Sequence, residues 1–286
     1  MIIDSHVHIY PPEVVRDAGS IGEREPYFRR LTSSPVHRWG TAEDLLVRMH
    51  ADGVDQSWVC GFAFADLGLC RLCNDYVLEA AERSGGRLRP LAVVPPLARG
   101  AMGEIERAAS RGAIGVGELF PQGQGFELAD ERQTWRLAGV CHEGGLFALV
   151  HTAEPVGHDY PGKGDVGPRE AAAFCEHHPE TPVVFAHFGG GLWLYEQMPE
   201  MRRILSNAWY DTAAAPFLYR PGVFDALFAS GVGGKLLYGS DFPLLGLPRY
   251  RRLLEGSRLG EEDRARLLGG NAQRLLGSLT VPLPCS

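Results

Sequence analysis

The sequence predicts an α/β protein with a (β/α)8 TIM-barrel fold, and two observations carry this prediction. Eight short runs rich in β-branched and aromatic residues alternate with stretches that have helical character, a pattern typical of parallel strands joined by crossover helices. No glycine-rich dinucleotide-binding fingerprint follows the first run. Eight strand–helix units without that fingerprint favour a closed barrel over a doubly wound open sheet.

The expected elements follow one another along the whole chain. Strands are expected at 2–8, 56–62, 89–95, 113–119, 146–151, 182–187, 208–212 and 235–241. Helices are expected at 42–52, 74–84, 101–111, 130–143, 168–178, 198–206, 220–230, 248–255 and 261–276. Thr41 and Asp44 have the spacing of a capping box, with Asp in place of the usual Glu, at the start of the first helix.

The length of 286 residues is compatible with one domain, because barrels of roughly 250 residues fold as single units. We expect one domain over 1–286, since the chemical signals described below extend from the first strand to the last. Residues 10–40 carry four prolines and no confident element. Long segments of this kind in compact domains are usually functional, so we expect a lid over one end of the barrel.

Composition and charge exclude several classes of protein. The 28 Lys and Arg residues against 35 Asp and Glu residues give a net charge of −7, which argues against a nucleic-acid binder. No apolar run approaches the ~18 residues of a membrane span, and the first residues lack the pattern of a signal peptide. We therefore expect a cytoplasmic protein that acts on a small molecule and whose six cysteines are thiols.

The strongest chemical signal is the run from Asp4 to His8 on the first strand. Side chains two residues apart on a strand share a face, so Asp4, His6 and His8 are expected to point into the barrel together. His6 and His8 fall at the carboxyl end of the strand, where barrel active sites lie. Two neighbouring imidazoles suit Zn²⁺, whereas the alternative is a pair of core histidines without a metal.

Other strands end in residues of the same kind. His151, His187 and Asp241 close the fifth, sixth and eighth strands, and Glu118 is expected to share the inward face of Val116 on the fourth. These strand ends meet at one mouth of a barrel, so the set predicts a metal-binding site. Glu118 could bind the same metal, bridge two metals or orient a histidine ligand.

Two further regions supply candidates near this mouth. Asp211, on the seventh strand, is expected to orient a neighbour or to cap a helix. The loop after the fifth strand offers Glu154, His158, Tyr160 and Lys163 as substrate contacts, and Lys163 could meet a substrate carboxylate. The alternative for this loop is a solvated segment without a role in binding.

A family resemblance rests on these residues. His6-x-His8, His151, His187 and the motif Gly-Ser-Asp241-Phe-Pro, in this order, resemble the amidohydrolase superfamily of metal-dependent barrels. The closer resemblance is to the amidohydrolase-related branch that includes amino-carboxymuconate-semialdehyde decarboxylase and other non-oxidative decarboxylases. The segment Gly269-Gly270-Asn271-Ala272 is similar to the last helix of that branch.

The resemblance implies roles for individual residues. In the decarboxylase pattern, the positions of His6, His8, His151 and Asp241 hold one Zn²⁺, and that of His187 is an acid or base beside it. In TatD-like relatives with two metals, the position of Glu118 is also a metal ligand. The resemblance thus implies one or two divalent ions, with Zn²⁺ expected, and barrels of this family commonly form homo-oligomers.

Two functions are compatible with this residue set. The main prediction is a hydrolase that uses metal-activated water to cleave a C–N or C–O bond in an amide, cyclic amide or lactone. It assigns His6, His8, Glu118, His151 and Asp241 to the metal and proton transfer to Asp241. The second catalytic residue, His187, would polarise the substrate carbonyl or complete the coordination of a second ion. The alternative is a Zn-dependent non-oxidative decarboxylase of an unsaturated or aromatic acid, which would use the same residues. A barrel that binds a ligand without catalysis is a third possibility.

Overall fold

Eight parallel strands lie in sequence order around a barrel in the computed structural model, which describes residues 1–279. They are β1 (Ile3–His8), β2 (Gln56–Cys60), β3 (Leu88–Ala92), β4 (Gly115–Leu119), β5 (Phe147–Val150), β6 (Val183–Phe185), β7 (Ala208–Asp211) and β8 (Leu236–Leu237). Backbone hydrogen bonds join the last strand region to the first, from Ser5 N to Tyr238 O at 2.8 Å and from Asp241 N to His6 O at 3.0 Å. These bonds close the sheet and confirm the predicted (β/α)8 class.

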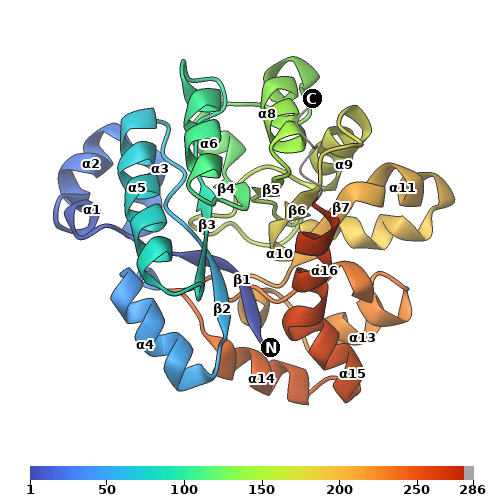
Figure 1. The fold of residues 1–286 in the computed structure, drawn as a ribbon. Helices are drawn as coiled ribbons and strands as arrows, with labels where there is room; N and C mark the ends of the chain where they lie inside the picture. Colours follow the sequence, from blue (N-terminus) through green and yellow to red (C-terminus); the bar gives the residue numbers. More distant parts are fainter. Residues whose placement is uncertain (280–286) are drawn as a thin grey trace, which may run out of the picture.

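Helices surround the strands on the outside of the barrel (Figure 1). The α-helices are α1 (Pro12–Arg16), α2 (Ala18–Arg24), α3 (Pro26–Thr32), α4 (Ala42–Asp52), α5 (Leu67–Arg83), α6 (Ala101–Ser110), α7 (Pro121–Gln124), α8 (Glu131–Glu143), α9 (Pro168–His177), α10 (Ala186–Gly189), α11 (Pro199–Ile204), α12 (Ala215–Leu218), α13 (Gly222–Ala229), α14 (Leu247–Glu255), α15 (Glu261–Ala265) and α16 (Asn271–Ser278). Shorter turns are η1 (Leu192–Gln197), η2 (Leu205–Asn207), η3 (Gly233–Lys235) and the π-helical η4 (Arg266–Gly270).

The predicted helices are confirmed with two differences in extent. Helix α5 begins at Leu67 rather than at 74, because the Asp66 side chain accepts from Leu69 N and caps an earlier first turn. The helix expected over 261–276 is divided by η4. A side chain at Gly269 would lie 2.3 Å from the carbonyl oxygen of Met1, so only glycine allows the start of the chain to pass there.

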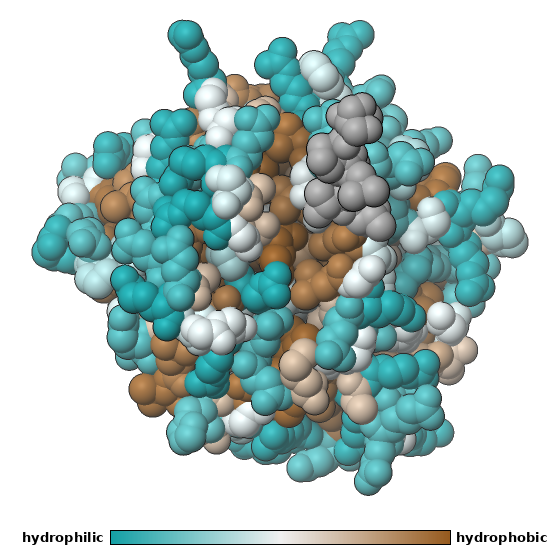
Figure 2. Space-filling view, viewed as in Figure 1, coloured by the Kyte–Doolittle hydropathy of each residue, from teal (hydrophilic) through white to brown (hydrophobic). Residues whose placement is uncertain are grey.

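The strand side chains alternate between two packed layers. Trp58 on β2 and Phe147 on β5 meet with ring centroids 5.1 Å apart. These strands are not neighbours in the sheet, so the contact crosses the inside of the barrel. Val59 and Val116 belong to the other cluster, which also contains buried residues of the outer helices. In Figure 2, hydrophilic residues cover most of the visible face and hydrophobic residues show between them.

A bulge in β1 overturns one predicted orientation. The register between β1 and β2 shifts between Asp4 and Val7, so the simple alternation of side chains is broken there. Asp4 pairs with Ser57 on the outer side, whereas His6 and His8 turn inward. The prediction that all three residues share one face is therefore wrong for Asp4.

A second irregularity lies in β4, where the register with β5 shifts between Val116 and Leu119. Gly117 between them has a φ of +138°, and a Cβ there would lie 2.1 Å from the Leu149 carbonyl oxygen. Val116 faces the outer helices, so it does not share a face with Glu118 as predicted. Glu118 nevertheless points inward, because the bulge reverses the alternation.

Residues 10–40 contain α1, α2 and α3, although no element was expected there. Proline occupies the first turn of α1 and α3, where its missing N–H costs nothing. Phe28 is fully buried, with its ring 5.1 Å from that of Phe62 and 5.0 Å from that of Phe64. The buried Glu25 carboxylate accepts from the backbone N–H groups of Ala65 and Asp66 at 3.1 and 2.9 Å. These contacts fasten the segment to the loop between β2 and α5.

The described cysteines are packed thiols. Cys60, Cys70, Cys73, Cys141 and Cys175 are free and buried, and burial raises the pKa of Cys73 and of Cys141 to about 12. The sixth, Cys285, lies outside the described residues. Within residues 1–279, no helix is both long enough and apolar enough to cross a membrane.

The capping box at the start of α4 is confirmed and gives a stability prediction. Asp44 N donates to Thr41 Oγ1 at 3.2 Å, and Thr41 N donates to Asp44 Oδ2 at 3.0 Å. We expect Thr41→Ala to lower the free energy of unfolding by about 1 kcal/mol, because one helix-end donor loses its partner. Urea denaturation measures this loss. Thr41→Ser, which keeps the oxygen, should remain close to the parent, and an equal loss in both variants would contradict the capping role.

Candidate metal centre and substrate cavity

Six side chains converge at the carboxyl ends of the strands. Ligand atoms of His6, His8 and Asp241 lie within 4.8 Å of one another, and so do those of Glu118, His151 and His187. The structure therefore brings together all six residues that the sequence predicted for the metal and for proton transfer.

Glu118 lies between these two groups of ligand atoms. Its Oε2 is 3.5 Å from His6 Nε2 and 3.4 Å from His8 Nε2. Its Oε1 is 3.1 Å from His151 Nδ1 and 3.6 Å from His187 Nε2. One carboxylate thus faces four imidazole nitrogens.

Unusual backbone conformations position two of these residues. His187, directly after β6, has a φ of +55°, and Asp241, after β8, has a φ of +62°. Residues other than glycine rarely adopt this left-handed conformation, which costs free energy and is concentrated at functional sites. The strand ends are thus bent so that both side chains reach the centre.

Asp211 holds residues of the first and sixth strands together by hydrogen bonds. This agrees with one of its two predicted roles, the orientation of a neighbouring side chain. The fully buried carboxylate of Asp211 accepts a hydrogen bond from His6 Nδ1 at 2.7 Å. Its other oxygen accepts from the backbone N–H of His187 at 3.0 Å and of Ala213 at 2.9 Å. Because the carboxylate holds Nδ1 of His6, Nε2 of the same ring faces the centre. Carboxylates commonly orient metal-binding histidines in this way.

Backbone carbonyls orient the other imidazoles. His187 Nδ1 donates to the Ala213 carbonyl at 2.9 Å, and His8 Nδ1 donates to the Gly61 carbonyl at 3.2 Å. His151 Nε2 donates to the Lys163 carbonyl at 3.0 Å, so its Nδ1 faces Glu118 instead. Each ring therefore has one nitrogen held by the protein and one directed at the centre.

The electrostatics of the centre favour bound positive charge. Burial raises the pKa of Glu118, but His6 and His151 outweigh burial and hold it well below its usual value. Burial lowers the pKa of His6, but Glu118 and Asp211 outweigh it and raise that pKa well above the ordinary value. Burial also lowers the pKa of His187, but hydrogen bonding to Glu118 and the charge of Asp241 outweigh burial and raise that pKa to about 9. A nitrogen and carboxylate donor set that retains positive charge in a buried site fits a divalent transition-metal ion.

A cavity of about 390 Å³ opens directly above these residues. Its floor contains His8, Glu118, His151, His187 and Asp241. Its walls are mainly apolar and aromatic, and the segment 10–40 supplies one side of them. The wall residues include Tyr10, Tyr27, Leu31, Val36, Phe62, Phe120, Tyr160, Phe217, Leu218 and Leu244.

The predicted substrate contacts lie at different places. His158 lines the cavity. The Lys163 ammonium donates to carbonyls of its own loop, at 3.1 Å to Val156 and 3.2 Å to His158, and Lys163 does not line this cavity. Glu154 is half-buried and also does not line it. Roles for Glu154 and Lys163 in binding substrate therefore stay predictions.

The sequence interpretation missed most of the aromatic wall, although Tyr160, one of the candidate contacts, does line the cavity. Tyr27, Phe120 and Phe217 come from three separate segments and have no shared spacing. One signal could have found them: they lie in loops after predicted strands or in the segment 10–40. An aromatic residue there has no place in the core face of a predicted helix or strand.

Comparison with known proteins identifies the family. The family model described as amidohydrolase matches residues 3–278. The chain belongs to the amidohydrolase family. It is thus an enzyme of a metal-dependent superfamily, as the resemblance implied. No curated protein matches the sequence of this amidohydrolase.

Solved structures share the fold at low sequence identity. The 5-carboxyvanillate decarboxylase LigW from Sphingomonas paucimobilis has a TM-score of 0.78 at 15% identity, covering 98% of this chain and 99% of that chain. A dihydroxybenzoic acid decarboxylase from a Polaromonas species, with bound manganese and the inhibitor 2-nitroresorcinol, has a TM-score of 0.70 at 16% identity and covers 96% of both chains. The 4-oxalomesaconate hydratase LigJ from Rhodopseudomonas palustris has a TM-score of 0.67 at 18% identity, covering 97% of this chain and 96% of that chain. At these identities the likeness shows a shared fold.

Proposed function

We propose that this amidohydrolase catalyses the metal-dependent, non-oxidative decarboxylation of a small aromatic or unsaturated carboxylic acid. The observation that carries the proposal is the apolar, aromatic cavity placed directly on the six-residue centre. Apolar surroundings disfavour a charged carboxylate more than neutral CO₂, so such walls promote loss of CO₂. They also suit the flat body of an unsaturated acid.

The donor set fits a divalent ion, and we propose Zn²⁺. His6, His8 and Asp241 would hold it together with Glu118 and His151, all of which direct a ligand atom at the centre. When bound, such an ion neutralises and polarises a substrate oxygen. Asp211 and the Gly61 carbonyl keep His6 and His8 in position for this task.

The protein must also supply one proton. In decarboxylation the bond between the substrate carbon and its carboxyl carbon breaks, the electron pair stays on the substrate carbon, and a proton replaces the departing CO₂. His187 Nε2 and the Asp241 carboxyl group both lie at the cavity floor, within reach of a substrate that sits on it. We assign proton delivery to these two groups.

The segment 10–40 is proposed to act as the lid of this cavity. Tyr10, Tyr27, Leu31 and Val36 of the segment line the cavity. A cover of this kind excludes bulk water from the reacting carbon. We further propose that the enzyme works in the cytoplasm as a homo-oligomer, in keeping with its family resemblance.

Hydrolysis of an amide or lactone is the second candidate, and Glu118 favours it. This carboxylate belongs to one group of ligand atoms and lies within 3.5 Å of two histidines of the other. A carboxylate between two groups of ligands is suited to bridging two ions, which is the arrangement expected for activation of water.

The two candidates are separated by products and by metal content. The metal-loaded enzyme is incubated with a panel of hydroxybenzoic and unsaturated acids and with a panel of lactones and cyclic amides. We expect CO₂ release from the acids, its loss after treatment with a strong chelator, and its return when Zn²⁺ is restored. Ring opening of lactones or amides by an enzyme with two ions per chain, without CO₂ release, would overturn the decarboxylase proposal.

A further inference from the structure

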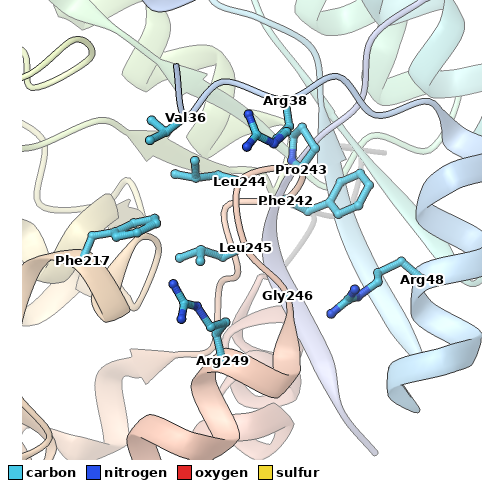
Figure 3. Close-up of a pocket in the computed structure, with 10 residues that line it drawn as sticks. All are labelled: Val36, Arg38, Arg48, Phe217, Phe242, Pro243, Leu244, Leu245, Gly246 and Arg249. Atoms are coloured by element: carbon cyan, nitrogen blue, oxygen red, sulfur yellow. The ribbon is translucent and has the colours of Figure 1, made fainter. Parts of the chain in front are cut away.

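A second cavity adjoins the substrate cavity. It has a volume of about 370 Å³ and lies around the loop between β8 and α14 (Figure 3). The two cavities share part of their lining, so they lie next to each other. The shared residues are Val36, Arg38, Phe217, Pro243 and Leu244.

The polar lining of this second cavity is entirely cationic. Arg38, Arg48 and Arg249 line it, and none of the acidic residues in the described range 1–279 does. Figure 3 shows the three side chains arranged around the loop from different sides. This concentration of positive charge stands out in a chain with a net charge of −7.

Two of these arginines have no carboxylate partner. Within residues 1–279, neither Arg38 nor Arg249 forms an ion pair, and Arg38 donates only to the carbonyls of Pro35 and His37. Both are exposed side chains that also line the cavity. Their guanidinium groups are therefore available to an oxyanion.

The third arginine, Arg48, is held by a carboxylate of its own helix. Arg48 Nε is 2.6 Å from Asp52 Oδ2, which holds the guanidinium in place. A Cβ at Gly246 would lie 2.8 Å from Arg48 Nη2, so the glycine allows the guanidinium to approach the cavity closely. Gly246 also precedes the nine-residue helix α14 and provides no side-chain cap. The uncapped helix start adds partial positive charge on the same side.

We propose that this second cavity binds an oxyanion, either a carboxylate or a phosphate group. The arginines would hold the charged oxygens, with Arg249 and Arg38 contributing free guanidinium groups. Val36 and Phe217, each 53% exposed, give the cavity an apolar rim against which an organic body can pack. The oxyanion could be a second charged group of a substrate that extends from the adjoining cavity, or a free anion. This binding site does not depend on the proposed decarboxylation.

Calorimetric titration of the metal-loaded enzyme tests the proposal without turnover. The probes are inorganic phosphate, the aromatic dicarboxylate isophthalate and the monocarboxylate benzoate. We expect saturable binding of phosphate or isophthalate that weakens at least tenfold in Arg249→Gln and in Gly246→Ala. Arg252→Gln is the matched control, because Arg252 lies on the same helix, does not line the cavity, and hydrogen-bonds only to the Pro248 carbonyl among the described residues. This control should bind the probes like the parent.

The pattern across probes identifies the source of the oxyanion. A substrate-borne group is indicated if isophthalate binds at least tenfold more tightly than benzoate and this difference disappears in Arg249→Gln. A free anion is indicated if phosphate binds unchanged in the presence of saturating benzoate. If Arg249→Gln and Gly246→Ala, shown by thermal unfolding to be folded, bind every probe as the parent does, the second cavity is not an oxyanion site.

Discussion

Asp241→Asn is expected to reduce kcat/KM at least about 100-fold, the lower range for loss of a positioned acid or base. Asp241 follows the last strand, β8, and its left-handed conformation places its carboxylate 3.6 Å from His8 Nε2. Asparagine has nearly the same shape but carries no negative charge and cannot take up or release a proton at neutral pH. The substitution thus removes one of the proposed anionic ligands, which is also one of the two groups proposed to deliver the proton.

Three measurements on this variant separate chemistry from folding. CO₂ release gives kcat and KM, elemental analysis gives the metal content per chain, and thermal unfolding reports on the fold. Asp263→Asn is the control, because Asp263 lies on α15 and its one ion pair within residues 1–279 is with Arg266. Retention of more than a tenth of the parent activity by Asp241→Asn, with metal bound, would remove Asp241 from the catalytic centre.

The barrel was predictable from the sequence because its signals are local. Each strand is a short apolar run, and the catalytic candidates His8, His151 and His187 mark strand ends in a way that periodicity reveals. A barrel places all its strand ends at one mouth, so residues distant in sequence could be grouped without any knowledge of contacts. The six-residue centre follows from this topology.

Side-chain orientation was less predictable, since bulges depend on neighbouring strands. Glu118 points inward as predicted, but the prediction assumed a regular alternation of side chains that β4 does not have. Because Gly117 has no side chain, β4 can lie close to the Leu149 carbonyl on β5. The hydrophobic periodicity of the sequence does not predict this close approach. Asp4 was placed inside the barrel for the same reason and lies outside it.

The substrate cavity was the least predictable part. Its walls combine Tyr27 from α3, Phe62 from the loop after β2 and Phe217 from α12. These residues come together only through tertiary packing, and each is an ordinary aromatic residue in its own segment. Lys163 is the opposite case. It was predicted to contact substrate because it is charged and near the mouth, but its ammonium donates to carbonyls of its own loop.

Asp211 is the buried residue on which the geometry of the centre most depends. One of its oxygens accepts from His6 Nδ1, and the other accepts from two backbone N–H groups, those of His187 and Ala213. All three partners are donors. An asparagine at this position must therefore direct its NH₂ group at a donor in either of its two orientations.

We expect Asp211→Asn to weaken metal binding 10- to 100-fold, as is typical when a residue that orients a metal ligand is replaced. The free energy of unfolding should also fall by about 1–3 kcal/mol, because a buried donor loses its acceptor. Tyr210→Phe is the matched control, because Tyr210 lies next to Asp211 on β7. This variant removes the buried hydrogen bond from Tyr210 to Glu196 and leaves the hydrogen bonds of the six-residue centre in place. Titration of the metal-free protein with Zn²⁺ should show weakened affinity in Asp211→Asn alone, and excess metal should restore much of its kcat. Equal metal affinity in both variants, at similar losses of stability, would show that Asp211 supports the barrel and does not orient His6.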